Sequence, residues 1–192
     1  LGDRMKSYEA AYSPRLTPRL PVIVRVDGRA FHTLTRNFRK PFDQKLTETM
    51  DKATYEVSRK LQGCILAYTQ SDEASFILQT DRHHETQSPW GGDVIKLVTT
   101  TASAMTVAYN SIFQPTSRNL WGEFDARAFV MPWDEVPNYL IWRFRDAQRN
   151  SVTMKALSMY SHKELLGKST QDKLVMMRQV PECAWEKESA RN

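Results

Sequence analysis

The chain has 192 residues, 41% of them hydrophobic, and its 27 Lys and Arg against 22 Asp and Glu give a net charge of +5. This length supports one domain with a hydrophobic core, and the modest basic excess suits an anionic partner without identifying one. Two cysteines, Cys64 and Cys183, are too few for a disulfide scaffold or a cysteine zinc site, and no apolar stretch is long enough to cross a bilayer. We therefore expect one soluble domain over residues 1–192 in a reducing compartment, the cytoplasm.

The first expected elements are a strand and a helix. A polar segment interrupted by prolines precedes the apolar run 20–27, which predicts a buried strand that Gly28 ends with a turn. Apolar residues then recur three and four positions apart from Leu46 to Leu61, and this spacing predicts a helix that ends near Gly63.

The later elements follow from the same periodicities. In chain order we expect strands over 64–68 and 74–79, a helix over 94–112, a strand over 124–131 and a helix over 134–150, followed by polar helical segments. The β-branched run 98–101 disfavours the helix over 94–112. The order strand, helix, strand, strand, helix, strand predicts an α+β fold, a ferredoxin-like split βαβ antiparallel sheet with appended helices.

Two aspartates that follow apolar runs are expected to meet. Asp27 closes the first strand, and Asp72 lies near the tip of the hairpin formed by the next two strands. In a ferredoxin-like sheet the first strand lies beside that hairpin, so the two carboxylates can approach each other. Close carboxylates repel unless a proton or a cation compensates, and hard oxygen ligands select Mg²⁺ or Mn²⁺.

A simpler interpretation of each aspartate is a turn cap. Asp27 could cap the turn before Gly28, and Asp72 the hairpin, with solvent as the partner of each. For either residue alone we favour this interpretation. Because Arg29 and Ser71 beside them suit phosphate, the pair together favours a metal site.

The order of the motifs gives a more specific interpretation. The chain resembles the tRNAHis guanylyltransferases and, more closely, the bacterial and archaeal guanylyltransferase-like proteins that polymerise RNA in the 3′-to-5′ direction. The motifs that carry the resemblance are Arg25–His32, Lys40–Asp43, Tyr68–Glu73, Phe124–Arg127 and Asn138–Ser151. The resemblance extends over residues 5–177, and the five motifs in this order are far more specific than any one of them.

The resemblance implies a polymerase palm-like catalytic domain and assigns roles to residues. Asp27 and Asp72, with the carbonyl of Gly28, would hold two Mg²⁺ ions, and Glu73 would add negative charge as a third catalytic residue. Phe31 and His32 would offer surfaces to a base, and Lys40 and Lys96 would contact the triphosphate. The full set of expected nucleotide-binding residues is Asp27, Gly28, Arg29, Ala30, Phe31, His32, Lys40, Asp43, Ser71, Asp72 and Lys96.

The resemblance also implies a two-step reaction on tRNA by a homotetramer, a dimer of dimers. ATP or GTP first activates a 5′-monophosphorylated tRNA end and releases pyrophosphate; the 3′-hydroxyl of an incoming nucleoside triphosphate then displaces AMP. Eukaryotic members carry a His-Ile-Asn-Asn segment linked to histidine-tRNA recognition, and residues 148–151 here are Gln-Arg-Asn-Ser. This difference favours template-directed repair of tRNA 5′ ends over guanylate addition to histidine tRNA.

The candidate RNA-binding residues lie in the C-terminal part of the chain. They are Arg149, Asn150, His162 and Lys163. The first two could equally be ion-pair partners on an exposed helix, and the last two could belong to a solvated helix end.

Two other functions stay open at this point. A nucleotide cyclase-like enzyme would act on free triphosphate without RNA, and a catalytically silent protein would keep the palm only as an RNA-binding scaffold. The intact set of Asp27, Gly28, Lys40, Ser71 and Asp72 argues against silence.

Overall fold

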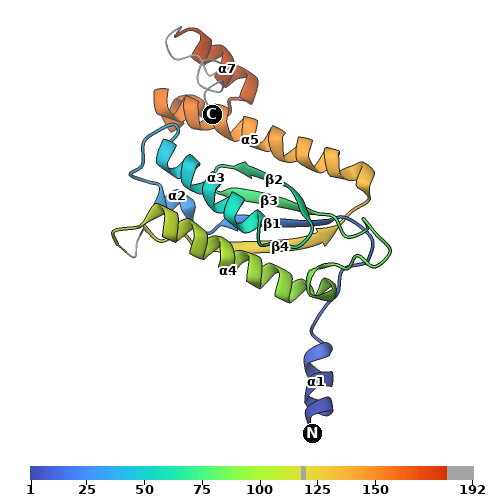
Figure 1. Cartoon of the computed structure of the whole chain (residues 1–192). Helices are drawn as coiled ribbons and strands as arrows, with labels where there is room; N and C mark the ends of the chain where they lie inside the picture. The colour runs from blue at the N-terminus through green and yellow to red at the C-terminus, as the bar shows by residue number, and fades with distance from the viewer. Residues whose placement is uncertain (118–119, 181–192) are drawn as a thin grey trace. The chain divides into compact units, whose positions relative to one another are not determined.

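The computed structural model describes residues 1–117 and 120–180, so Cys183 lies outside the described residues (Figure 1). The chain forms two compact units. The first comprises residues 1–36 and 45–140, and the second comprises residues 37–44 and the chain from 141 onward. A single domain over 1–192 stays a prediction.

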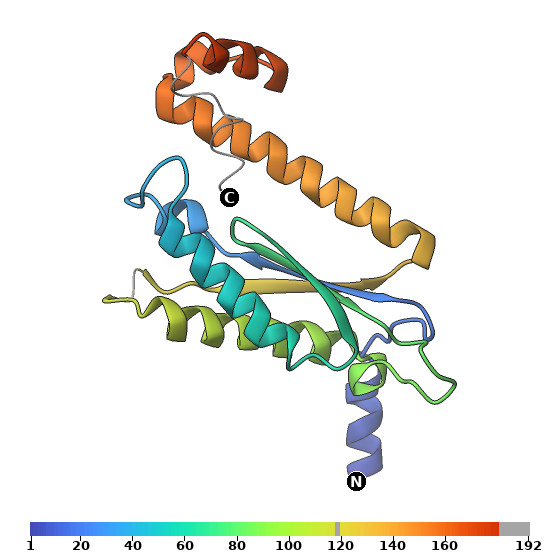
Figure 2. The ribbon, with the colours of Figure 1, turned by 45° about the horizontal axis from the view of Figure 1, so that its top comes forward.

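The first unit is built on a four-stranded antiparallel sheet in the order β2-β3-β1-β4. Its strands are β1 (Val22–Gly28), β2 (Cys64–Gln70), β3 (Glu73–Leu78) and β4 (Phe124–Val130). Two helices, α3 (Gln44–Ser58) and α4 (Val94–Phe113), connect them and lie on one face of the sheet (Figure 2). This is the strand order of a ferredoxin-like, palm-like sheet, and the predicted fold class is confirmed.

The helix over 94–113 forms in spite of its β-branched residues. Asp93 caps its first turn, accepting a hydrogen bond from the backbone N–H of Lys96 at 3.0 Å. The hydroxyl of Thr101 donates to the carbonyl of Leu97 at 2.7 Å, which satisfies a buried polar group. Leu97, Thr101 and Met105 are fully buried at a spacing of four, so burial of one face outweighs the unfavourable propensity.

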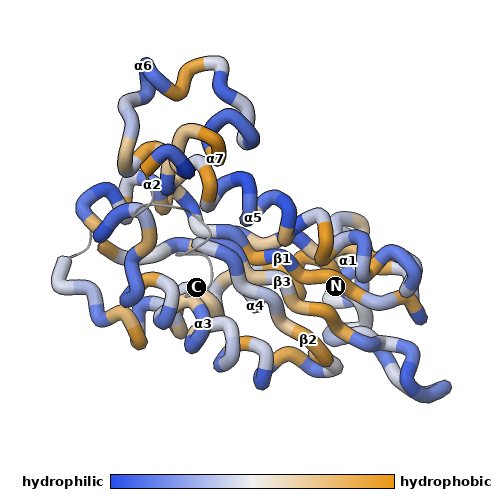
Figure 3. The backbone as a smooth tube through the Cα atoms, turned by 90° about the horizontal axis from the view of Figure 1, so that it is seen from above, coloured by the Kyte–Doolittle hydropathy of each residue, from blue (hydrophilic) through white to orange (hydrophobic). Residues whose placement is uncertain are grey.

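The two faces of the sheet differ in character. Side chains alternate along a strand, so Val22, Val24 and Val26 point to the face that α3 and α4 cover, and all three are fully buried. Ile23, Arg25 and Asp27 point to the opposite face, which turns from apolar to charged toward the end of β1. Figure 3 shows the hydrophobic residues concentrated on the strands.

The first turns of α5 (Val136–Met159) close the apolar end of this second face. Val136 and Tyr139 pack with Ile23 and Ile77 in one buried cluster. The Tyr139 hydroxyl lies 2.7 Å from the hydroxyl of Ser75 on β3, so the polar end of this buried side chain is hydrogen-bonded.

Helix α5 is longer than predicted, and the remaining helices are short. Residues 133–135 form a 3₁₀ turn, and α5 then continues nine residues beyond the predicted end at Asn150. The other helices are α1 (Gly2–Ala10), α2 (Phe31–Leu34), α6 (His162–Leu165) and α7 (Thr170–Arg178), with a 3₁₀ turn over Pro89–Gly92. None of the helices in the described residues is long and apolar enough to cross a membrane.

The second unit has its own small hydrophobic core. Val152 and Ala156 of α5 pack with Leu165 and Met177, which come from α6 and α7. Ser161 and Ser169 start α6 and α7 with capping boxes, each closed by an acidic residue three positions later. The predicted polar helical segment is therefore held by an apolar seam and by local caps.

Candidate active site

The structure brings Asp27 and Asp72 together at the end of β1. Asp27 is the penultimate residue of β1, and Asp72 is the second residue of the two-residue loop that joins β2 to β3. The backbone N–H of Gly28 donates to the carbonyl oxygen of Asp72 at 3.0 Å, so the hairpin tip is fixed beside the strand end. This is the approach expected from the topology.

The pKa of Asp72 responds both to burial and to the neighbouring carboxylate. Burial raises the pKa of Asp72, and the negative charge of Asp27 raises it further. Hydrogen bonds from the backbone N–H of Asp72 and from Ser71 act in the opposite direction and do not cancel the increase. A cation placed between the carboxylates would remove the repulsion.

The oxygen donors here suit Mg²⁺ bound together with a phosphate. Asp27, Asp72 and the carbonyl of Gly28 offer hard ligands, which Mg²⁺ prefers. Among the described residues, no group of three or more His, Cys, Asp or Glu side chains could hold a metal ion. Water or substrate oxygens would therefore have to supply the further ligands of a bound ion.

Glu73, the third predicted carboxylate, is built into the sheet. It lies directly opposite Asp27 in the register of β1 and β3, and it is buried. Its carboxylate oxygen is 3.9 Å from Nε of Arg25, with both side chains at most 13% exposed. Glu73 thus balances a buried arginine, and its catalytic role stays a prediction.

The loop after β1 is held by its backbone. The N–H of Arg29 donates to the carbonyl of Glu123 at 2.8 Å, and Ala30 starts α2 in the left-handed conformation with φ of 54°. Because the N–H groups of Gly28 and Arg29 are already used, backbone contacts to a phosphate would come from Ala30 onward. The Arg29 side chain forms an exposed ion pair with Glu123 at 3.3 Å, which a phosphate can replace at little cost.

Phe31 does not offer a surface to a base, contrary to expectation. It is 4% exposed, and its ring centroid lies 5.4 Å from that of Tyr109 and 5.1 Å from that of Phe124. Burial in this aromatic cluster outweighs its position in a polar loop, so its side chain anchors the loop to the core. His32, by contrast, is exposed.

Two glycines leave room for these aromatic rings. A Cβ atom at Gly28 would lie 2.4 Å from a ring carbon of Phe31, and one at Gly122 would lie 2.6 Å from a ring carbon of Tyr109. Both distances are shorter than any tolerated carbon contact. The turn at Gly28 therefore needs glycine for packing.

Asn110 of α4 fixes the segment that carries Gly122. Its amide nitrogen donates to the carbonyl of Gly122 at 2.8 Å, and its amide oxygen accepts from the N–H of Gly122 at 2.9 Å. The next residue, Glu123, accepts the Arg29 hydrogen bond. Asn110 thus supports the loop after β1 indirectly, through the residues Gly122 and Glu123 that precede β4.

We expect Asn110→Ala to destabilise the protein by about 1–3 kcal/mol, because both polar groups of the Gly122 backbone lose their partner. Asn110→Asp keeps the acceptor and should cost less. Denaturant unfolding measures both, with Ser103→Ala on the exposed side of α4 as the control. Equal stability of wild type and Asn110→Ala would contradict this role.

One of the two predicted nucleotide-binding lysines, Lys96, is not brought to the aspartates. Lys96 is in the first turn of α4, whereas Tyr109, in its last turns, packs at the Phe31 end; the helix rise separates them by about 20 Å. The structure thus places Lys96 at the far end of the sheet from Asp27. Lys40 and Asp43 belong to the second unit, so their contacts stay predictions.

The structure gives the backbone conformation of Ser71 and the surroundings of the predicted RNA-binding residues. Ser71 has φ of 52°, a conformation that is uncommon outside glycine and that turns the hairpin tip. Arg149 pairs with Asp146 at 2.8 Å, and Asn150 approaches the same carboxylate at 3.5 Å. His162 and Lys163 are exposed on α6. RNA binding by these four residues stays a prediction.

The structure adds residues that sequence reasoning left out of the site. Asp125 and Arg127 on β4 lie directly opposite Asp27 and Arg25 on β1. The sequence signal is the pair of mirrored segments, Arg-Val-Asp in β1 and Asp-Ala-Arg in β4. Only the antiparallel register shows that these segments place like charges side by side.

The fold and the acidic pair define a palm-like domain of the nucleotidyltransferase class. The chain belongs to the tRNAHis guanylyltransferase family, whose family model matches residues 2–132.

Solved structures and curated sequences agree with this assignment. A bacterial tRNA(His) guanylyltransferase (Thg1)-like protein in complex with ATP is 38% identical with a TM-score of 0.93, covering 97% of this chain and 82% of that one. Such a protein in complex with GTP is 40% identical with a TM-score of 0.78, covering 88% of this chain and 75% of that one. The tRNA(His) guanylyltransferase of Eremothecium gossypii is 33% identical over 71% of this chain. The chain spans 60% of the length of that relative and 45% of the probable enzyme of Homo sapiens.

Proposed function

We propose that this chain is a metal-dependent nucleotidyltransferase that activates tRNA 5′ ends and extends them in the 3′-to-5′ direction. The observation that carries the proposal is the Asp27 and Asp72 pair, held beside the loop that Gly28 begins. Family membership supports it, as do the bacterial relatives solved with ATP and with GTP. Either nucleotide would serve for activation.

Asp27, Asp72 and the carbonyl of Gly28 would hold Mg²⁺, two ions in the full site. When bound, Mg²⁺ supplies positive charge against the reacting phosphates and the leaving pyrophosphate. The protein's own part is to keep the two carboxylates close and partly desolvated, which the Gly28 to Asp72 hydrogen bond does. The exposed Arg29 side chain would then exchange Glu123 for the triphosphate.

The proposed chemistry has two displacements at phosphorus. An oxygen of the RNA 5′-phosphate attacks the α-phosphorus of ATP, and the bond to the bridging oxygen breaks to release pyrophosphate. The 3′-hydroxyl of the incoming triphosphate then attacks the 5′-terminal phosphorus, loses its proton and displaces AMP. Both steps need the attacking and leaving oxygens in line, so one pair of carboxylates can serve both.

We propose template-directed repair of tRNA 5′ ends as the physiological reaction, since residues 148–151 lack the segment linked to histidine tRNA. A homotetramer and a cytoplasmic location complete the proposal. The first rests on family resemblance, and the second on the two cysteines of the composition.

The test uses a 5′-monophosphorylated tRNA that lacks its first nucleotide. With Mg²⁺ and ATP alone we expect adenylylated RNA and pyrophosphate, and we expect only the triphosphate complementary to the template position to be added afterwards. Addition of guanylate whatever the template would favour the histidine-tRNA reaction. If neither this RNA nor a 5′-triphosphorylated RNA is extended, or if ATP is converted to a cyclic nucleotide, the proposal is wrong.

A further inference from the structure

The charged face of the sheet is ordered in rows that run across the strands. The register places Asp125, Asp27 and Glu73 in one row. The neighbouring row is two residues away on each strand, about 7 Å, and consists of Arg127, Arg25 and Ser75. We call these the acidic row and the basic row.

The basic row places two positive charges side by side. Arg25 and Arg127 are directly opposite on neighbouring strands, where like charges destabilise a sheet. Glu73 forms an ion pair with Arg25, and both of these side chains are largely buried. Arg127 is exposed, and within the described residues no carboxylate lies within ion-pair distance of it. An anion over this row would offset the repulsion and accept hydrogen bonds from the guanidinium groups.

The order of features along β1 indicates which anion this is. The loop after β1, where we expect the nucleotide, begins at Gly28 beyond one side of the acidic row, and the basic row lies on the other side. In an in-line displacement the leaving group and the attacking oxygen stand on opposite sides of the reacting phosphorus. With a nucleotide's phosphates directed to the loop, the attacking oxygen must approach over the basic row.

We propose that Arg127, with Arg25 beside it, binds the 5′-terminal monophosphate of the RNA substrate. This inference rests on the proposed function, since it names the binding site of the attacking group. Beyond the row, Ile23 and Ile77 are covered by Val136 and Tyr139, so the face is closed on that side. The bound phosphate is thereby confined to the space next to Asp27.

The test compares two forms of one tRNA, with a 5′-monophosphate and with a 5′-hydroxyl, in equilibrium binding with Mg²⁺ and no nucleotide. We expect wild type to prefer the phosphorylated form by about tenfold, the effect of hydrogen bonds to a charged group. Arg127→Gln should reduce this preference close to one and leave the affinities for 5′-hydroxyl RNA and ATP unchanged. Arg127→Lys, which keeps the charge without the planar fork, should keep part of it.

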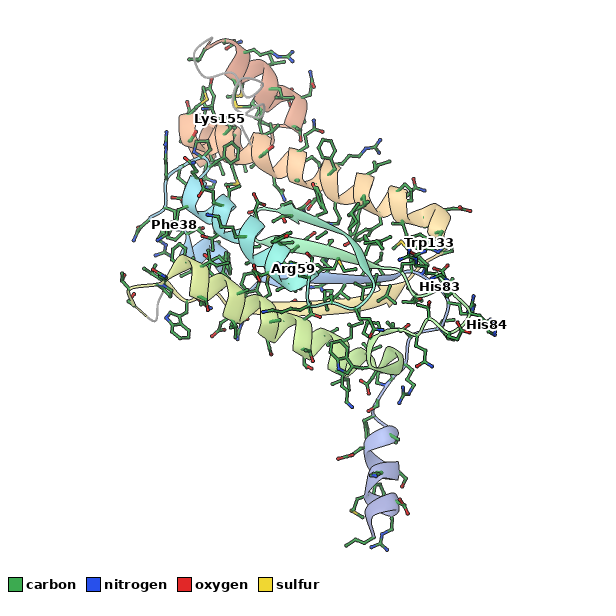
Figure 4. All side chains as sticks on the ribbon, viewed as in Figure 1. Phe38, Arg59, His83, His84, Trp133 and Lys155 are labelled. Atoms are coloured by element: carbon green, nitrogen blue, oxygen red, sulfur yellow. The ribbon has the colours of Figure 1, made fainter. Side chains whose placement is uncertain are left out.

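The matched control is Arg59→Gln, which removes the same charge from the exposed turn that follows α3 and is labelled in Figure 4. It should keep the full preference. A preference that survives Arg127→Gln, an equal loss for both RNAs, or a loss of ATP affinity instead would each overturn the inference. Nucleotide transfer by a wild type without any 5′-phosphate preference would overturn it too and leave the proposed function intact; the preference without transfer would refute the proposed function alone.

Discussion

Asp27→Asn and Asp72→Asn should each lower nucleotidyl transfer by about a thousandfold or more. Each removes one of two charged ligands for a metal whose stabilisation of the transition state is several kcal/mol, and each 1.36 kcal/mol is a tenfold change in rate. Single-turnover transfer to a 5′-triphosphorylated RNA measures the chemical step without activation. Turnover of either variant within tenfold of wild type would contradict the metal assignment.

Stability separates this effect from misfolding. The pKa of Asp72 is raised above its ordinary value of 3.8, so the folded state holds that proton more tightly than the unfolded state does. The stability from the protonated carboxyl is therefore complete below pH 3.8 and is lost as pH rises through the raised value. At neutral pH, Asp72→Asn should make the metal-free protein more stable than wild type, whereas Mg²⁺ should raise the melting temperature of wild type only.

Phe31→Ala should destabilise the protein by about 3–5 kcal/mol, the usual cost of removing a buried aromatic ring. The ring fills the space between Tyr109 and Phe124, so its loss leaves a cavity under the loop after β1. The affinity for ATP should fall as well, because the loop after β1 loses its anchor to the core. Denaturant unfolding and calorimetric titration with ATP measure the two effects. A loss of ATP affinity with unchanged stability would mean that Phe31 contacts the nucleotide instead.

The contact between Gly28 and Phe31 provides the control. Gly28→Ala should cost about 1–3 kcal/mol in wild type, because the new methyl group overlaps the Phe31 ring. The same change in a Phe31→Leu background should cost clearly less, since the ring is gone. Equal costs in the two backgrounds would show that Gly28 is needed for its backbone and not for this packing.

The sequence predicts the sheet well because its information is local. Apolar runs and helical spacings give the order of elements, and the order gives the pairing that joins Asp27 to Asp72. The helix over 94–113 could be predicted in spite of its β-branched run, since its apolar spacing is continuous. The end of α5 was missed because no glycine or proline follows Asn150 until Gly167.

The residues that were misplaced depend on contacts between distant segments. The sequence around Phe31 predicts an aromatic residue in a loop, whereas its contact with the ring of Tyr109, far along the chain, makes it a core residue. Lys96 is assigned to the triphosphate by resemblance, but the length of α4 separates it from Asp27. The role proposed for Arg127 depends on its register with Arg25, and no spacing within β4 can predict that register.

The direction of synthesis shows whether the protein transfers nucleotides to an RNA 5′ end, the reaction that we assign to the acidic pair. The substrate is a 5′-monophosphorylated tRNA lacking its first nucleotide, with its 3′ end blocked by periodate oxidation and with an α-labelled triphosphate complementary to the template. We predict that the label is incorporated as efficiently as with an unblocked 3′ end and that it maps to the 5′ terminus. Incorporation that disappears when the 3′ end is blocked would mean that the protein extends 3′ ends instead.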